Sequence, residues 1–175
     1  MKLVHVVAMS RNRVIGDKNR LLWHLPADIK RFKDLTMGHA VLLGRKTYDS
    51  LPERFRPLPG RTNIVLSGGS AGMAPGAMLV PSIQGALKLA VERKISELFV
   101  IGGSSIYLQT LGLTQEIYLT RVDVDMDGDA KYPELTPATW DETSLAVQPA
   151  DGLHAYACTF SLLKRRQTVD PLRLL

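Results

Sequence analysis

The sequence predicts a helix that begins near residue 26, and an aspartate lies on the apolar side of this helix. The stretch LLWHLPADIKRFKDLT, residues 21–36, reads as a helix from Pro26, because proline is tolerated in a first helical turn. At about 100° per residue, the apolar side of this helix consists of Leu25, Ile29, Phe32, Leu35 and Thr36. The charged residues that spread around the rest are Lys30, Arg31, Lys33 and Asp34. Asp28 falls between Leu35 and Phe32, on the flank of the apolar stripe.

The position of Asp28 has two interpretations. A carboxylate in a first helical turn is favoured by the helix dipole and can accept hydrogen bonds from free N–H groups, which needs no function. Alternatively, Asp28 is a buried acid that binds a cationic or amidine-like group or assists proton transfer. Burial raises the pKa of a carboxyl group and a helix N-terminus lowers it, so both interpretations and the ionisation state stay open at this point.

Two predicted strand-to-helix turns share one chemistry. The sequence VLLGRKT places Gly44 after a buried strand and before Arg45 and Lys46, and FVIGGSSIY places Gly102 and Gly103 before two serines. Glycine lets a backbone approach a ligand closely, and a helix N-terminus favours an anion. The pair therefore suggests one bisphosphorylated ligand, such as a dinucleotide, although glycines also make plain tight turns. Neither turn matches the G-x-G-x-x-G or Walker A pattern.

Metal and covalent chemistry find no support in the sequence. The four histidines, at positions 5, 24, 39 and 154, show no ligand spacing, and Cys158 is the single cysteine. No G-x-S-x-G elbow is present. We therefore expect neither a metal site nor a covalent intermediate.

Short apolar runs alternate with helical patterns, which is typical of an α/β fold. The predicted strands cover residues 3–8, 40–44, 62–67, 97–103, 116–124, 144–148 and 154–163. The predicted helices begin at 26 and at 83 and cover 45–51 and 104–111, while 52–61 and the glycine-rich 68–76 read as loops. This order predicts a mixed, mostly parallel twisted central sheet with a C-terminal antiparallel hairpin and about four flanking helices.

Composition and charge narrow the class of protein. A chain of 175 residues that is 45% hydrophobic fits a single domain, which we expect over 1–163, followed by a basic tail of unknown role over 164–175. The net charge of +5 could indicate nucleic acid, but the tail carries +3 of it and only 6% of residues are aromatic. The absence of a signal sequence or membrane span, together with one cysteine, leads us to expect a cytoplasmic protein.

Six segments together resemble the dihydrofolate reductase family, and Asp28 in place of glutamate is similar to its bacterial branch. They are RVIGDKN, LLWHLPADIKRFK, LLGRKTYDSL, RPLPGRTNIVLS, FVIGGSSIY and IYLTRVDVDMDGDAKYP, in the family's order and over about residues 3–163. The resemblance implies reduction of 7,8-dihydrofolate to 5,6,7,8-tetrahydrofolate with NADPH. It also implies binding of antifolate inhibitors, no nucleic acid or membrane partner, and a monomer.

The resemblance assigns roles in the substrate site residue by residue. Asp28 would hydrogen-bond N3 and the 2-amino group of the pterin ring, with Thr120 bridging through water. Trp23 would anchor a loop and help to hold an ordered water, and Leu21 would lie in the mobile loop that closes over the nicotinamide. Arg61 would clamp the α-carboxylate of the glutamate tail. The residues implied to line the folate pocket are Val6, Val7, Ala8, Ile29, Phe32, Leu51, Leu58 and Ile101.

The same resemblance implies a cofactor site around the two glycine turns. Arg45, Lys46 and Ser67 would surround the 2′-phosphate of NADPH, and Tyr107 would lie near the nicotinamide. The full implied set is Ala8, Ile15, Gly16, Gly44, Arg45, Lys46, Thr47, Leu66, Ser67, Gly102, Gly103, Ser104, Ser105, Ile106, Tyr107 and Gln109. A cis peptide bond is implied between Gly102 and Gly103.

The implied reaction is hydride transfer to C6 of dihydrofolate with protonation of N5 through water, assisted by Asp28. Two other functions are open from the sequence. A related reductase of a pyrimidine intermediate in riboflavin synthesis would keep the glycine turns but has no need for the W-x-L-P-x-D segment or Arg61. A basic nucleic-acid-binding domain would place its cations and aromatic residues on one face.

Overall fold

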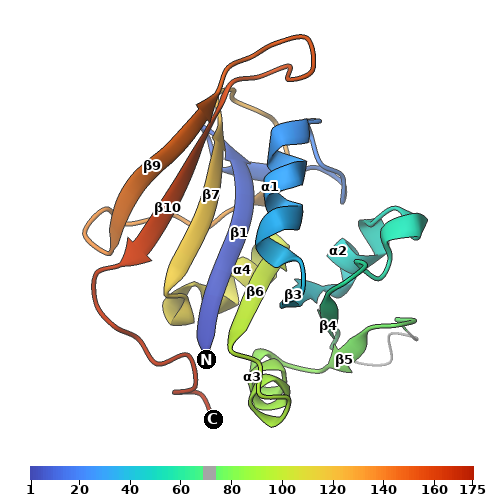
Figure 1. The fold of residues 1–175 in the computed structure, drawn as a ribbon. Coiled ribbons are helices and arrows are strands. Elements are labelled where there is room, and N and C mark those ends of the chain that lie inside the picture. Colours follow the sequence, from blue (N-terminus) through green and yellow to red (C-terminus); the bar gives the residue numbers. More distant parts are fainter. Residues whose placement is uncertain (69–73) are drawn as a thin grey trace.

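The protein is described by a computed structural model that covers residues 1–68 and 74–175, so most of the predicted loop 68–76 lies outside the described residues. Its centre is an eight-stranded twisted sheet in the order β5-β4-β3-β6-β1-β7-β10-β9 (Figure 1). All neighbours from β5 to β7 are parallel, whereas β10 runs antiparallel to both β7 and β9. The predicted mixed sheet with a C-terminal hairpin is confirmed.

The strands of this sheet follow the apolar runs of the sequence. Their bounds are β1 Lys2–Ser10, β3 Ala40–Gly44, β4 Thr62–Leu66, β5 Met78–Val80, β6 Glu97–Gly102, β7 Glu116–Val122, β9 Trp140–Gln148 and β10 Cys158–Arg165. Two further short strands, β2 Val14–Gly16 and β8 Ala130–Lys131, pair with each other. Strands β2, β5 and β8 were not predicted, because strands of two or three residues are too short for a hydrophobic period.

Four α-helices flank the sheet, as predicted. They are α1 Pro26–Thr36, α2 Arg45–Ser50, α3 Ile83–Glu92 and α4 Ser104–Thr110, with short 3₁₀ turns at Glu53–Phe55 (η1) and Leu111–Leu113 (η2). Ser82 caps α3 by accepting a hydrogen bond from the backbone N–H of Gly85 at 3.0 Å. The α1 helix begins at Pro26, the residue from which the sequence predicts it.

Alternation along the strands divides the core into two layers. Val4, Val41 and Phe99 pack with residues of α1 and α2 on one face of the sheet. Leu3 and Val100 pack with residues of α3 and α4 on the opposite face. In Figure 1, α1 lies alongside β1, on the side away from β7. Because Asp28 belongs to α1, any site that it forms lies on this face of the sheet.

The C-terminal segment packs on the domain. β10 continues to Arg165, whose guanidinium donates hydrogen bonds to the backbone oxygens of Thr114 and Leu111 and lies 4.4 Å from the ring of Trp140. Pro171 is buried. The residues after the expected boundary at 163 therefore continue the last strand and then lie against the body.

A buried histidine occupies the middle of β1, on the face of α3 and α4. The ring nitrogens of His5 lie 2.7 Å from the hydroxyl of Tyr132 and 2.8 Å from the hydroxyl of Thr110. The Thr110 hydroxyl donates to the backbone oxygen of Ile106, so it accepts from His5. A neutral imidazole satisfies both partners, because one ring nitrogen donates to Thr110 and the other accepts from the Tyr132 hydroxyl. Burial, aided by the charge of Arg165, lowers the pKa of His5 to about 3.

We predict that His5 makes the fold sensitive to acid. Because its folded-state pKa lies below the ordinary value of 6.5, the unfolded chain binds the proton more tightly, and stability falls as the pH drops from 6.5 toward 3. The linkage amounts to about 2 kcal/mol by pH 5. Denaturant unfolding at pH 7.5, 6 and 5 measures it. His5→Gln should lose less stability over this range than the wild type, and the exposed control His24→Gln should lose the same; equal slopes for all three proteins would contradict the prediction.

Candidate active site

Asp28 faces the sheet from the first turn of α1. Its carboxyl group accepts a hydrogen bond from the side chain of Thr120 on β7. Thr120 is buried, and Asp28 is half-buried. Burial raises the pKa of Asp28, while the Thr120 hydrogen bond and the charge of Arg31 lower it. The apolar flank of α1 therefore carries a partly desolvated acid with one fixed hydrogen-bond partner.

The N-terminus of α1 is held by a histidine from the loop between β9 and β10. No side chain of the preceding segment caps the helix, and Pro26 has no N–H to satisfy. The backbone N–H of Ala27 instead donates to Nε2 of His154 at 3.1 Å, and Nδ1 of His154 lies 2.8 Å from Oδ1 of Asp151. The position of Asp28 thus depends on a contact between residues 127 apart in sequence.

Arg31 does not lie on the solvated side of the helix, and its placement among the outward charges was wrong. Its guanidinium carbon lies 4.9 Å from the ring centre of Phe160 and 5.7 Å from that of Tyr118. The aliphatic stem of an arginine packs on apolar surface, so the apolar face of α1 is wider than the helical wheel implied. Arg31 follows Asp28 by three residues, and that spacing was the signal that places both on one face.

Most of the residues expected to line a pterin pocket belong to one apolar cluster beside Asp28. The members of this cluster from the expected set are Val6, Phe32, Leu51, Leu58 and Ile101. Ala8 pairs with Thr120 in the register of β1 and β7. Ile29 is 48% exposed at the edge of the wall. Val7 packs on the opposite face of the sheet, so only its backbone runs along this wall.

The loop between β2 and α1 turns sharply before it reaches the site. Asp17 and Arg20 exchange backbone hydrogen bonds of 3.1 and 2.8 Å. A Cβ at Gly16 would lie 2.9 Å from the backbone oxygen of Arg20, so the turn requires glycine there. Leu21, next along the chain, is 72% exposed, whereas Trp23 packs against the buried cluster of Leu25, Val122, Cys158 and Phe160. Trp23 therefore anchors this loop to the core, whereas Leu21 is exposed to solvent.

Arg61 is oriented by contacts on two sides. Its Nη1 donates to the Thr36 hydroxyl at 3.1 Å and its Nε donates to the Pro59 backbone oxygen at 3.0 Å. Its guanidinium carbon lies 5.7 Å from the Phe32 ring centre. Burial lowers the pKa of Arg61, but an arginine remains charged at neutral pH. A fixed planar guanidinium at the edge of the apolar wall suits a carboxylate.

The two glycine turns lie side by side, because β3 and β6 are neighbours and Leu43 pairs with Gly102. The peptide bond between Gly102 and Gly103 is cis, as implied. A Cβ at Gly44 would lie 3.2 Å from Cγ1 of Ile106, and one at Gly103 would lie 3.2 Å from the Thr47 hydroxyl. A side chain at either position would crowd these neighbours, so glycine lets the two turns pack closely against α4 and α2. The buried hydroxyl oxygen of Ser104 has no hydrogen-bond partner among the described residues.

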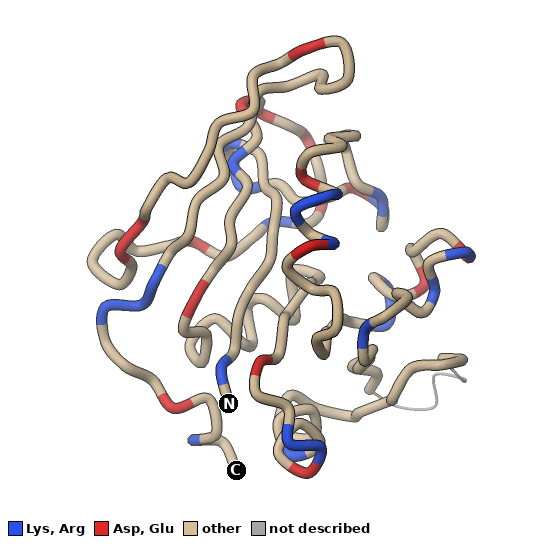
Figure 2. The backbone as a smooth tube through the Cα atoms, viewed as in Figure 1, with Lys and Arg blue, Asp and Glu red and all other residues tan. Residues whose placement is uncertain are grey.

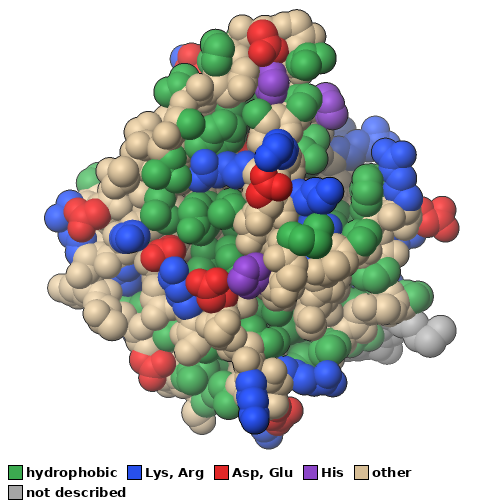
Figure 3. Space-filling view, in the orientation of Figure 1, with side chains coloured by type: hydrophobic (Ala, Val, Ile, Leu, Met, Phe, Trp, Pro, Cys, Tyr) green, Lys and Arg blue, Asp and Glu red, His purple; other side chains and the backbone are tan. Residues whose placement is uncertain are grey.

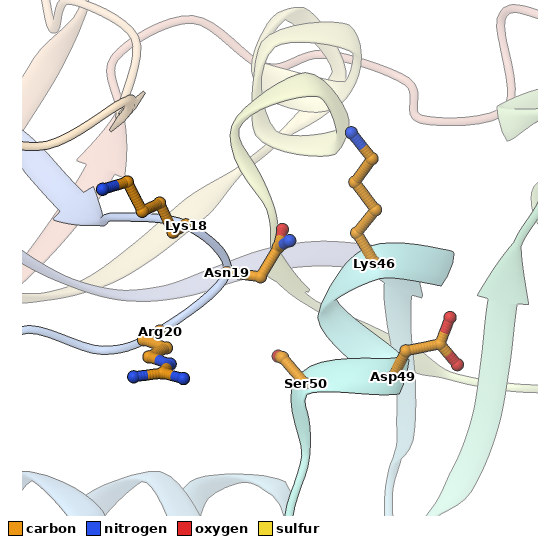
Figure 4. A pocket seen from close by; sticks show the side chains of 6 residues that line it. All are labelled: Lys18, Asn19, Arg20, Lys46, Asp49 and Ser50. Carbon is orange, nitrogen blue, oxygen red and sulfur yellow. The ribbon is translucent and has the colours of Figure 1, made fainter.

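Cations gather on both sides of a hollow beside the first turn. This hollow has a volume of about 350 Å³ and lies between Lys18, Asn19 and Arg20 of the loop and Lys46, Asp49 and Ser50 of α2 (Figure 4). Arg45 is paired with Asp49 through its Nε at 2.8 Å. The structure therefore adds Lys18 and Arg20 to the two cations that the sequence singled out near this turn.

The remaining residues of the expected cofactor set surround these turns. Ile15 and Gly16 belong to β2, Leu66 ends β4 and Ser67 follows it, with its backbone N–H bonded to Val80. Ser105 and Gln109 bond to each other on α4 at 2.9 Å. Tyr107 donates its hydroxyl to the backbone oxygen of Val6 at 2.6 Å. Burial and the charge of Asp28 raise the pKa of Tyr107, so it stays neutral.

The described residues carry charges of both signs. Lys and Arg residues are interspersed with Asp and Glu along the described chain (Figure 2). On the face that α1 crosses, hydrophobic side chains reach the surface between charged ones (Figure 3). The described residues contain no group of three or more side chains able to hold a metal ion. No described helix is long and apolar enough to cross a membrane.

Comparison with known proteins identifies the family of this chain. A dihydrofolate reductase family model matches residues 2–165. Dihydrofolate reductase type 3 from Salmonella typhimurium is 37% identical over 162 residues, 93% of this chain and 97% of that protein. Dihydrofolate reductase from Haemophilus influenzae is also 37% identical, over 92% of this chain and 97% of its own.

A solved structure agrees with the sequence relatives. Dihydrofolate reductase from Enterococcus faecalis, solved with NADP(H) and RAB-propyl, matches with a TM-score of 0.81 and 31% identity over 95% of this chain and 97% of that one. The chain therefore belongs to the dihydrofolate reductase family. The two alternative functions considered from the sequence find no support in these matches.

We predict that His154 positions the active-site helix. His154→Ala leaves the N–H of Ala27 without an acceptor, which should lower the free energy of unfolding by about 1–2 kcal/mol. Denaturant unfolding at constant pH measures this loss. His24→Ala, which removes an exposed histidine, is the matched control and should change stability by less than about 0.5 kcal/mol. A His154→Ala protein as stable as the control would show that the cap contributes nothing.

Proposed function

We propose that this protein reduces 7,8-dihydrofolate to 5,6,7,8-tetrahydrofolate with NADPH, with Asp28 holding the pterin ring. One observation carries the proposal: a half-buried carboxylate, hydrogen-bonded by Thr120, sits in an apolar wall close to two glycine turns that lie side by side. A pterin offers two neighbouring donors, N3–H and the 2-amino group, at one edge of a flat ring whose faces can pack on apolar side chains. A carboxylate at the edge of an apolar wall matches that pattern.

The substrate has a second anchor at its other end. Dihydrofolate carries a glutamate tail, and its α-carboxylate is the group that Arg61 would bind. The contacts of Arg61 with Thr36 and Pro59 fix its plane before a ligand arrives, which reduces the entropy lost on binding. Between the two anchors, the Val6, Phe32, Leu51, Leu58 and Ile101 cluster supplies apolar contact for the ring and linker, with Ile29 at its edge.

The residues around the glycine turns fit NADPH. Gly44 and Gly103 let the two turns pack closely side by side, the Ser104 hydroxyl is an orphaned buried group, and Arg45 and Lys46 supply positive charge beside the first turn. Gly44 to Thr47, Leu66 and Ser67 would hold the 2′-phosphate half, and Gly102 to Tyr107 with Gln109 the other, closed by Ile15, Gly16 and Ala8. When bound, NADPH supplies the hydride that C6 receives.

The residues of this chain orient the pterin ring and assist the protonation of N5. Asp28 orients the pterin through N3 and the 2-amino group, and its negative charge raises the basicity of N5. N5 takes its proton from water, with Thr120 and Trp23 helping to order the water and Leu21 closing the loop above it. Tyr107, neutral and bonded to the Val6 oxygen, fixes the backbone of β1 beneath the ring.

The central test replaces Asp28. Asp28→Asn should lower kcat/KM for dihydrofolate by about 100-fold or more, because the amide loses the charge that binds the pterin donors and supports N5 protonation. Absorbance at 340 nm follows turnover, and fluorescence titration should show an NADPH Kd close to that of the wild type. Asp34→Asn, an exposed charge change on the same helix, should retain activity. Unchanged turnover in Asp28→Asn would refute the proposal.

A second prediction concerns Arg61. Arg61→Lys should raise KM for dihydrofolate by about 10- to 100-fold with a smaller change in kcat, since lysine cannot make the paired hydrogen bonds of a guanidinium. A 7,8-dihydropterin without the glutamate tail should give the same KM with both proteins. Arg54→Lys, on the exposed 3₁₀ turn η1, is the control. An equal effect on the tail-less substrate would place Arg61 outside the tail site.

A further inference from the structure

Arg31 carries a buried positive charge that the proposed reaction does not use. Its guanidinium lies 4.9 Å from the Phe160 ring centre and 5.7 Å from that of Tyr118. Its Nη2 is buried and has no hydrogen-bond partner among the described residues. Burying a cationic nitrogen without a partner is costly unless aromatic faces or an opposite charge compensate. Here both are present, because Asp28 stands one helical turn earlier on the same face.

Two titratable groups that interact with the charge of Asp28, Tyr107 and Cys158, stay neutral through the physiological range. From α4, Tyr107 has a pKa raised by burial and by the charge of Asp28. From β10, the pKa of Cys158 is raised to about 11 by burial and by Asp28. Tyr118 on β7 faces Arg31, Thr120 does not titrate, and the His154 ring is engaged by Ala27 and Asp151. The charge of Arg31 acts in the opposite direction to burial, because it lowers the pKa of Asp28.

We propose that Arg31 is a positioning residue for the reaction, which keeps Asp28 ionised inside the apolar wall so that it can bind the pterin donors. This inference rests on the proposed role of Asp28 and adds a residue to it. The planar guanidinium suits the task because it stacks between Phe160 and Tyr118 and remains charged at every working pH. The two aromatic rings hold the guanidinium in place, and its Nη2 forms no hydrogen bond with a described residue.

We therefore expect Arg31 to determine the pH at which activity is lost on the acid side. Without the cation, burial acts on Asp28 unopposed, and the carboxyl group is protonated at a higher pH. A protonated carboxyl accepts poorly from the N3–H and 2-amino donors. The acid limb of the kcat/KM profile should therefore move to higher pH, while activity well above that limb changes little.

The experiment compares Arg31→Met with Arg31→Lys. Arg31→Met should lose about fivefold or more in kcat/KM at the acid end of the profile, and less than about twofold at pH 9. Arg31→Lys keeps the charge and should restore the wild-type acid limb. In the protein without substrate, ¹³C NMR of labelled aspartate, assigned with Asp28→Asn, should show the Asp28 carboxyl titrating at higher pH in Arg31→Met. Arg31→Gln is the neutral variant to use if the methionine variant does not fold.

Lys33→Met is the matched control, because it removes the same charge from an exposed position of α1 and should leave the Asp28 titration in place. An unchanged Asp28 titration in the folded neutral variants overturns the inference, as does a shift of equal size in Lys33→Met. These outcomes are separate from failure of the proposed function. That failure appears as normal dihydrofolate turnover in Asp28→Asn, whereas the NMR titration needs no substrate.

Discussion

The rest of the site depends on one constraint, which is that an ionisable carboxyl group must be held in a partly apolar wall. Such a group is costly to bury unless it has hydrogen-bond partners or a compensating charge. Thr120 provides the hydrogen bond and Arg31 the charge. His154 fixes the helix that carries the carboxylate by accepting from the N–H of Ala27. Three elements far apart in sequence, the β7 strand, α1 and the β9–β10 loop, therefore act together to position one side chain.

The order of strands explains how the cofactor turns come to lie near this acid. In a parallel sheet the carboxyl ends of neighbouring strands meet at one edge, where ligands of α/β proteins bind. The turns at Gly44 and Gly102 follow β3 and β6, which pair directly. β1 lies between β6 and β7 and so separates the Gly102 turn from Thr120 by a single strand. A ligand that spans the turns can thus reach a second ligand held at Asp28.

The sequence predicted those structural features that depend on residues close together in the chain. The proline start of α1, the Ser82 cap and the apolar strand at 40–44 are local signals, and the azimuth of Asp28 followed from helical geometry alone. The short strands β2, β5 and β8 owe their existence to pairing with distant partners, which leaves no periodic signal. His154 was unpredictable for the same reason, since the N–H that it accepts lies 127 residues away. Arg31 was missed although its i+3 spacing from Asp28 was visible, because a charged residue was assumed to face solvent.

Strand β1 joins the buried polar network of His5, on one face of the sheet, to the apolar wall on the other face. His5 on one face is bonded to Tyr132 and Thr110, and its ring centre lies 5.1 Å from that of Tyr107. Tyr107 donates its proton to the backbone oxygen of Val6, whose side chain belongs to the wall on the other face. Since burial keeps the phenol neutral, this donor persists at every working pH. The network that contains His5 therefore stabilises the fold and, through Tyr107, also holds the floor of the site in place.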